Sequence, residues 1–245
     1  MVLSTDQSRL LATPRWRWLP EVVERWYAEP LAAADGADPD EVTAVASGLD
    51  RELPEVLVEW YLLVGNRLQD VQDSPATLEE LPGAAYRDRP AWVGDTDGIV
   101  VWWENQGCWA LLVGSDGECF VNDNGYEFGP VPLPTALHAM VLSDTLVGVW
   151  SHGDRQPEGR IGPLGQIAAG VRGGAVMDGD VPCQALCAAY AELPVPGNPY
   201  FRVPPRGDSE TVLRGLEEDS PTFEWMTSSD AAFARLDKLV DLFGG

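Results

Sequence analysis

The sequence predicts an α+β protein in which N-terminal helices pack on a mainly antiparallel sheet, with a C-terminal β-strand plus helix extension. Apolar residues recur at helical spacing early in the chain, and short apolar runs separated by turn residues follow in its middle. A hydrophobic content of 45% is sufficient for a folded core. No long linker divides the 245 residues, so we expect one composite domain, 1–245, with a core at about 16–147 and an extension at about 148–245.

Three helices are expected in the first part of the chain, after a frayed lead-in at residues 1–14. Pro20 suits the first turn of a helix, and Asp38, directly before a proline, is a second helix start. The clearest helix follows the apolar stripe from Leu53 to Val64. The polar stretch 69–82 is expected to be a loop with a short helical turn near Leu78.

A three-stranded meander is expected next. The continuous apolar run Ile99–Trp103 is typical of a central strand covered on both faces. Asn105-Gln106-Gly107 favours a tight turn, because Asn and Gly tolerate positive φ. The other strands are expected at Cys108–Val113 and Glu118–Asn122, around a turn at Ser115–Gly117.

The C-terminal part is expected to contain further helices and strands. Pro134–Leu142 and Val181–Glu192 show helical patterns, and a last helix is expected from about Ser229 to Gly244. Short strands are expected at Tyr200–Val203, Glu210–Leu216 and Thr222–Trp225.

The chain is strongly acidic, with 39 Asp and Glu against 16 Lys and Arg and a formal charge of −23. Such a field disfavours nucleic acid and anionic membranes as partners, because both are bound through clustered cations. It favours a basic protein partner, although acidity that only maintains solubility is the open alternative. The N-terminus does not resemble a signal peptide, and no apolar run approaches the ~18 residues of a membrane helix, so we expect a cytoplasmic protein.

No motif for catalysis or for metal binding is evident. The sequence lacks a Gly-x-Ser-x-Gly elbow, a phosphate-binding loop, a His-Glu-x-x-His pair and a Cys-x-x-Cys pair. Two Asp- and Asn-rich segments, 95–98 and 122–125, lack the full ligand series of a calcium loop. We therefore expect no catalytic residue, no cofactor and no metal.

Two segments in a fixed order carry a family resemblance. Leu53-Pro54 opens a helix that closes on Gly65-Asn66, and the run Ile99–Trp103 continues into Glu104-Asn105-Gln106-Gly107. The return strand 108–113 and the turn 114–117 complete the pattern, over about residues 49–147. This order resembles the SUKH superfamily, which includes yeast cell-wall-synthesis regulators and bacterial toxin-immunity proteins. The C-terminal hundred residues exceed the minimal domain of that family.

The resemblance implies a non-enzymatic protein that binds and neutralises a cognate basic toxin of the nuclease or deaminase type. A regulatory or scaffold protein of the same fold, or a carbohydrate-binding or carbohydrate-processing protein, are the alternatives. The sequence leaves the oligomeric state open.

Eight residues are candidates for partner binding, in two groups. Trp102, Glu104, Asn105 and Gln106 lie around the expected hairpin, where the alternatives are core packing for the tryptophan and turn geometry for the polar residues. Asp95, Asp97, Asp116 and Glu118 lie in expected loops or near strand ends, and would form an anionic surface if they converge. The alternative for these four is a dispersed set of solvated charges.

Overall fold

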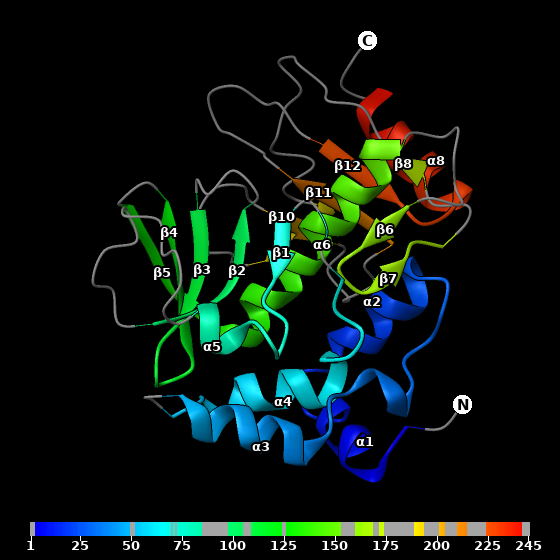
Figure 1. Ribbon diagram of the computed structural model, residues 1–245. Coiled ribbons are helices and arrows are strands. Elements are labelled where there is room, and N and C mark those ends of the chain that lie inside the picture. The colour runs from blue at the N-terminus through cyan, green and yellow to red at the C-terminus, as the bar shows by residue number, and fades with distance from the viewer. Residues whose placement is uncertain are drawn as a thin grey trace.

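The computed structural model describes residues 3–49, 52–69, 71, 73–84, 98–104, 109–123, 126–152, 160–168, 172–173, 189–193, 201–203, 210–214 and 224–241. N-terminal helices, a first sheet of five strands, a long central helix and a second sheet of five strands follow one another along the chain (Figure 1). All strand pairs in the described part of the chain are antiparallel. The predicted α+β class is confirmed.

The first helix, α1 (Thr5–Leu11), occupies the segment for which the sequence predicts a frayed lead-in, and that prediction is wrong. The Ser4 hydroxyl accepts a hydrogen bond from the backbone N–H of Gln7, and the Gln7 side chain accepts one from the N–H of Ser4. This capping box satisfies two donors that would otherwise be unpaired at the helix start. The Gln7 amide also donates to the carbonyls of Ala33 and Leu62, which fixes α1 to its neighbours.

The three helices predicted after it are confirmed as α2 (Trp18–Trp26), α3 (Pro39–Gly48) and α4 (Glu55–Val64), with a short 3-10 turn, η1 (Ala33–Asp35), between the first two. The Asp38 side chain caps α3 by accepting from the N–H of Asp40. Both α1 and α3 pack on α4, which in turn contacts the central helix α6 (Figure 1).

The first sheet has the strand order β1-β2-β3-β4-β5. Its strands are β1 (Asp73–Pro75), β2 (Ile99–Glu104), β3 (Trp109–Val113), β4 (Glu118–Asp123) and β5 (Tyr126–Pro132). The three predicted strands are confirmed as β2, β3 and β4, whereas β1 and β5 are additional to the prediction. The helical turn expected near Leu78 is found slightly later in the chain, as the short helix α5 (Leu81–Ala84).

Both faces of β2 are covered, as expected, although β3 rather than β2 is the middle strand of the sheet. The register between β2 and β3 shifts between Val100 and Trp102. Such a bulge places two residues of one strand against one of its partner, so Val101 and Trp102 both join the main core. Val100 belongs instead to a small apolar cluster with Ala110 and Leu112.

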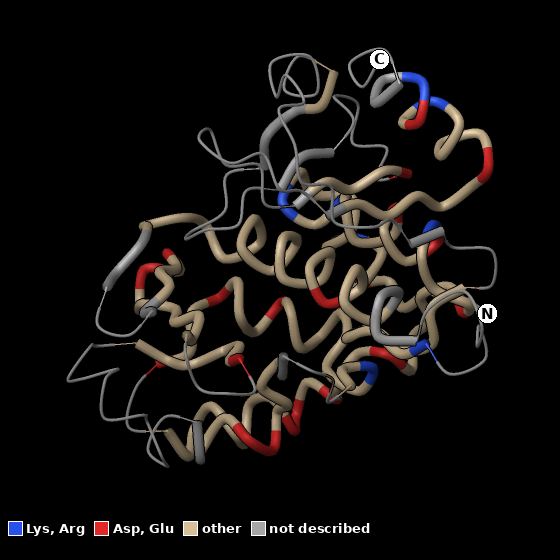
Figure 2. The backbone as a smooth tube through the Cα atoms, turned by 90° about the horizontal axis from the view of Figure 1, so that it is seen from above, with Lys and Arg blue, Asp and Glu red and all other residues tan. Residues whose placement is uncertain are grey.

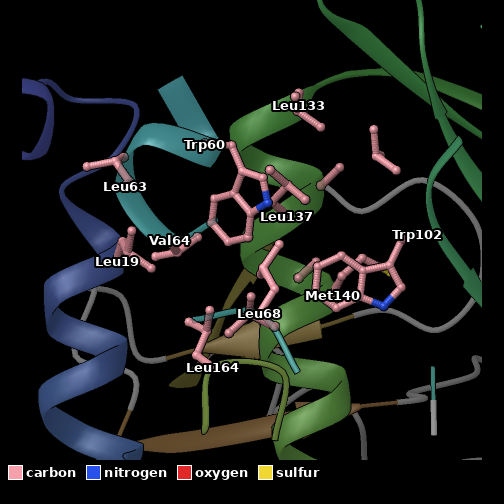
Figure 3. Close-up of a cluster of buried hydrophobic side chains, with 14 of the residues drawn as sticks. Leu19, Trp60, Leu63, Val64, Leu68, Trp102, Leu133, Leu137, Met140 and Leu164 are labelled. Atoms are coloured by element: carbon pink, nitrogen blue, oxygen red, sulfur yellow. The ribbon is translucent and has the colours of Figure 1, made fainter. Parts of the chain in front are cut away.

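Helix α6 (Leu133–His152) crosses the molecule between the two sheets and contacts strands of both (Figure 1). It is longer than the predicted segment 134–142, and the expected border near residue 147 falls inside it. Residues 136–146 are all buried, so this stretch of the helix has no solvent-exposed face. Figure 3 shows side chains of α4 and α6 meeting Trp102 of β2 and Leu164 in one cluster.

The C-terminal part forms a second sheet with the order β8-β12-β11-β10-β9. Its strands are β8 (Arg172–Gly173), β9 (Ala191–Leu193), β10 (Phe201–Val203), β11 (Thr211–Arg214) and β12 (Glu224–Thr227), and it follows the hairpin β6 (Ile161–Gly162) and β7 (Gly165–Gln166). The three predicted strands are confirmed as β10, β11 and β12, and the last helix as α8 (Asp230–Asp241).

The helix expected over 181–192 is wrong at its end, because residues 191–193 form β9, paired with β10. The rest of that expected helix, 181–188, lies outside the described residues. Val212 of β11 and Met226 of β12 belong to the same hydrophobic cluster as the first sheet and the helices. The extension therefore contributes to the main core.

Candidate functional site: an acidic edge of the first sheet

The predicted candidates are not gathered into one site. Asp95, Asp97, Asn105 and Gln106 lie outside the described residues. Trp102 is fully buried, and its indole N–H donates a hydrogen bond of 2.9 Å to Oδ2 of Asp144 on α6. A side chain in this position cannot contact a partner, so its assignment to a binding surface is wrong. The bulge in β2 is the structural reason, because it directs Trp102 into the core.

The other described candidates lie at opposite ends of the first sheet. Glu104 ends β2, where the register pairs it with Asp73 of β1. Asp116 and Glu118 lie at the far end, in and after the turn that joins β3 to β4. In an antiparallel sheet these two ends are separated by the length of the strands. Glu104 and the Asp116–Glu118 pair therefore belong to different surfaces.

The turn at the second end is held by backbone hydrogen bonds and by one side chain. The N–H of Gly114 donates to the carbonyl of Glu118, and the N–H of Gly117 donates back to the carbonyl of Gly114. Oδ1 of Asp116 accepts from the N–H of Glu118 at 3.0 Å. Gly117 has a φ of +82°, which a residue with a Cβ atom adopts only at a cost. Asp116 is exposed and Glu118 is half-buried.

Helix α4 begins directly beside this turn. A Cβ atom on Gly117 would lie 3.1 Å from Cγ2 of Val56, in the first turn of α4. Two exposed acids, Glu52 and Glu55, occupy this start of the helix. We call Glu52, Glu55, Asp116 and Glu118 the acidic edge. It joins two of the predicted residues to two that lie outside that prediction.

The described elements that form the acidic edge carry no cation beside it. Residues 52–66 and 90–154 contain no Lys or Arg, so neither the helix nor the strands beside the edge supply one. The ion pairs found within the described chain use other acids, namely Asp6, Asp35, Glu59 and Glu210. Figure 2 shows acidic positions on many elements and basic positions on few. Among the described residues, no cation therefore pairs with the acids of the edge.

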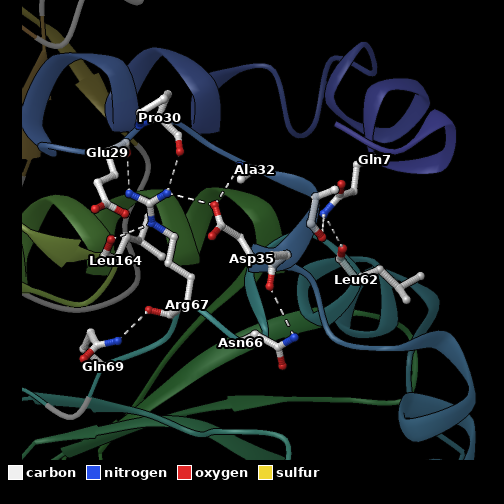
Figure 4. Close-up of polar contacts among 12 residues, drawn as sticks. Gln7, Glu29, Pro30, Ala32, Asp35, Leu62, Asn66, Arg67, Gln69 and Leu164 are labelled. Carbon is white, nitrogen blue, oxygen red and sulfur yellow. Dashed lines mark hydrogen bonds and ion pairs between the residues drawn. The ribbon is translucent and has the colours of Figure 1, made fainter. Parts of the chain in front are cut away.

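Buried charged groups in the described chain have structural partners instead. Glu59 accepts from the indole N–H of Trp16 at 2.7 Å and pairs with Arg15 at 3.2 Å. Arg67 donates to Asp35 and to three backbone carbonyls (Figure 4). These groups stabilise the interior and are not accessible to a partner.

No metal centre is found within the described residues. No group of three or more His, Cys, Asp or Glu side chains there could hold a metal ion. Cys119 is buried in β4, and burial raises the pKa of its thiol, which disfavours the reactive thiolate. None of the tryptophans whose side chains are described is fully exposed, and Trp103, Trp109 and Trp225 are half-buried.

Comparison with family models, with curated proteins and with solved structures finds no match to this chain. Within the described residues, the apolar helices are all too short or too polar to cross a lipid bilayer.

Proposed function

We propose that this chain is a protein-binding module of the SUKH type that neutralises a basic toxin, and that its acidic edge faces the partner. The observation that carries the proposal is the contact between the α4 start and the β3–β4 turn, which places four acids on neighbouring elements with no cation among the described residues of those elements. The helix α4 lies beside the β3–β4 turn and shares the main hydrophobic core with β2 and β3, which supports the fold assignment within this proposal.

Charge gives such a surface its specificity and its speed of association. A negative edge attracts a positively charged nucleic-acid-binding cleft and raises the rate of encounter, whereas it repels acidic proteins. A nuclease or deaminase must expose cations to bind its substrate phosphates. An acidic protein that covers those cations excludes the substrate without any chemistry of its own.

The proposal is tested by expressing the polypeptide encoded beside this chain, alone and together with it, in a bacterial host. We expect that polypeptide to be toxic alone, to be harmless with this chain, and to form a stoichiometric complex with it. The proposal is wrong if the neighbour is not toxic, or if it kills equally in both cultures. Recovery of several unrelated partners would favour the regulatory alternative instead.

A further inference from the structure

His138 lies in α6 at the point where α2 packs against it. The imidazole stacks on the indole of Trp18, with ring centroids 4.4 Å apart and planes inclined by 13°. The side chains are buried, with exposed fractions of 8% for His138 and 9% for Trp18. Neither Nε2 of His138 nor Nε1 of Trp18 has a hydrogen-bond partner among the described residues. The N-terminal end of α2 is therefore held to α6 by aromatic packing.

The stack continues through two further tryptophans, both of which are buried. Trp18 stacks on Trp60 of α4 at 6.4 Å, and Trp60 stacks on Trp16 at 5.9 Å. Among the described residues, the charged groups bonded to this stack are Glu59, which accepts from the Trp16 indole, and Arg15, its ion-pair partner. The guanidinium can only donate, and the Glu59 carboxylate is already engaged by the Trp16 indole and by Arg15, so this pair leaves no unengaged acceptor for a protonated imidazole.

The C-terminal end of α2 is held differently. The hydroxyls of Tyr27 and Thr145 are hydrogen-bonded at 2.6 Å, which ties this end to α6. The N–H of Ala28 donates to the carbonyl of Gln166, and the N–H of Ala168 donates to that of Trp26. Burial raises the pKa of Tyr27, so these contacts do not change ionisation in acid. The C-terminal end of α2 is thus hydrogen-bonded to α6, whereas among the described residues its N-terminal end meets α6 by packing and is bonded, through Trp16, to α4.

We propose that the His138–Trp18 stack is an acid-sensitive contact, and that protonation of His138 releases the N-terminal end of α2 from α6. An imidazolium needs an acceptor or water for both N–H groups, and the buried Nε2 has neither while the stack is closed. Moving the first turn of α2 away admits water to the ring. The bonded end of α2 then acts as the hinge.

The direction of the pH dependence follows from burial. Desolvation lowers the pKa of His138 from 6.5 to about 3, and no neighbouring charge contributes to that shift. Arg17 and Glu21, which flank Trp18 on α2, are exposed. The imidazole binds a proton less well in the closed form than in the open form. The closed form therefore has its full stability above pH 6.5, and this stability falls as the pH is lowered towards about 3. Between pH 8 and pH 5, opening becomes about 30-fold more favourable.

Hydrogen exchange on the full-length chain tests this proposal. Protection factors are measured at pH 8 and pH 5, corrected for the intrinsic pH dependence of exchange, for the first turn of α2 and for α6. The matched variant is His138→Phe, which retains a stacking ring but cannot be protonated. In the wild type, protection of the first turn of α2 falls about 30-fold between these pH values while α6 stays protected. In His138→Phe that fall is absent.

Two results overturn the proposal. The first is an equal fall in the wild type and in His138→Phe, which assigns the pH dependence to groups other than His138. The second is a parallel loss of protection in α2 and α6 of the wild type, which indicates global unfolding. Because this second comparison lies within the wild type, the proposal is testable even if His138→Phe does not fold.

Discussion

Replacing Arg67 with Met is expected to destabilise the fold strongly, because this guanidinium joins three separate segments. Nε donates to the carbonyl of Leu164 at 2.7 Å, beside the β6–β7 hairpin. Nη1 donates to Oδ2 of Asp35 at 2.9 Å and to the carbonyl of Pro30 at 3.1 Å, and Nη2 donates to that of Glu29 at 2.6 Å (Figure 4). The guanidinium also lies 5.9 Å from the centroid of the Tyr27 ring.

The size of the loss follows from which partners water can reach afterwards. Leu164 is buried, so its carbonyl loses a donor that water cannot replace, at a cost of about 1–3 kcal/mol. Asp35 retains the N–H of Ala32 as a donor, and Glu29 and Pro30 are exposed enough for water to reach their carbonyls. We therefore expect a loss of about 3 kcal/mol, at the lower end of the range for breaking a buried ion pair.

Chemical denaturation followed by far-UV circular dichroism measures this loss as a change in the free energy of unfolding. The matched control is Asp35→Asn, which keeps an acceptor for Arg67 and for the N–H of Ala32, and we expect it to cost about 1 kcal/mol. A loss below about 1 kcal/mol for Arg67→Met would show that Arg67 does not hold the three segments together.

Three further substitutions probe the interior and the turn. Tyr61→Phe removes the buried bond from its hydroxyl to the carbonyl of Ala76, and we expect thermal denaturation to show a loss of about 1 kcal/mol. Gly117→Ala imposes a positive φ on a residue with a Cβ atom. We expect urea denaturation to show a loss of about 1–2 kcal/mol in the free energy of unfolding. An unchanged urea midpoint would contradict the turn geometry. Trp102→Phe removes the indole donor to Asp144 and leaves space in the core. We expect urea denaturation to show a loss of about 2–4 kcal/mol in the free energy of unfolding. An unchanged free energy of unfolding would place Trp102 outside the core.

The sequence predicts those elements whose signals are local. The stripe from Leu53 to Val64 and the Asp38 cap specify helices without help from distant residues. The capping box of Ser4 and Gln7 is an equally local signal, which the expectation of a frayed lead-in does not take into account. By contrast, β5 contains Gly129, Pro130 and Pro132 and is a strand because it pairs with β4, which no local pattern shows.

The candidate site could be predicted only in part for the same reason. The acids of the β3–β4 turn are identifiable from the turn signal around Gly117. Their proximity to Glu52 and Glu55 depends on the contact between Gly117 and Val56, which joins segments about sixty residues apart. The burial of Trp102 depends on a bulge whose position is set by pairing with β3. Such tertiary relations become visible only in the folded chain.

The rate of association with the purified toxin partner tests most directly whether the acidic edge faces that partner. The test variant carries Glu52→Gln, Glu55→Gln, Asp116→Asn and Glu118→Gln, in which the amide introduced in place of the Asp116 carboxylate keeps an oxygen that can cap the turn. The control carries Glu21→Gln, Glu24→Gln, Asp40→Asn and Glu41→Gln, which remove the same charge from exposed positions on α2 and α3.

Stopped-flow mixing at low salt and at physiological salt gives the rate constants. We expect the acidic-edge variant to associate at least about tenfold more slowly than the wild type at low salt, and the control to stay within about threefold. Equal rates for the two variants, or a wild-type rate that does not respond to salt, would contradict the proposed role of the acidic edge.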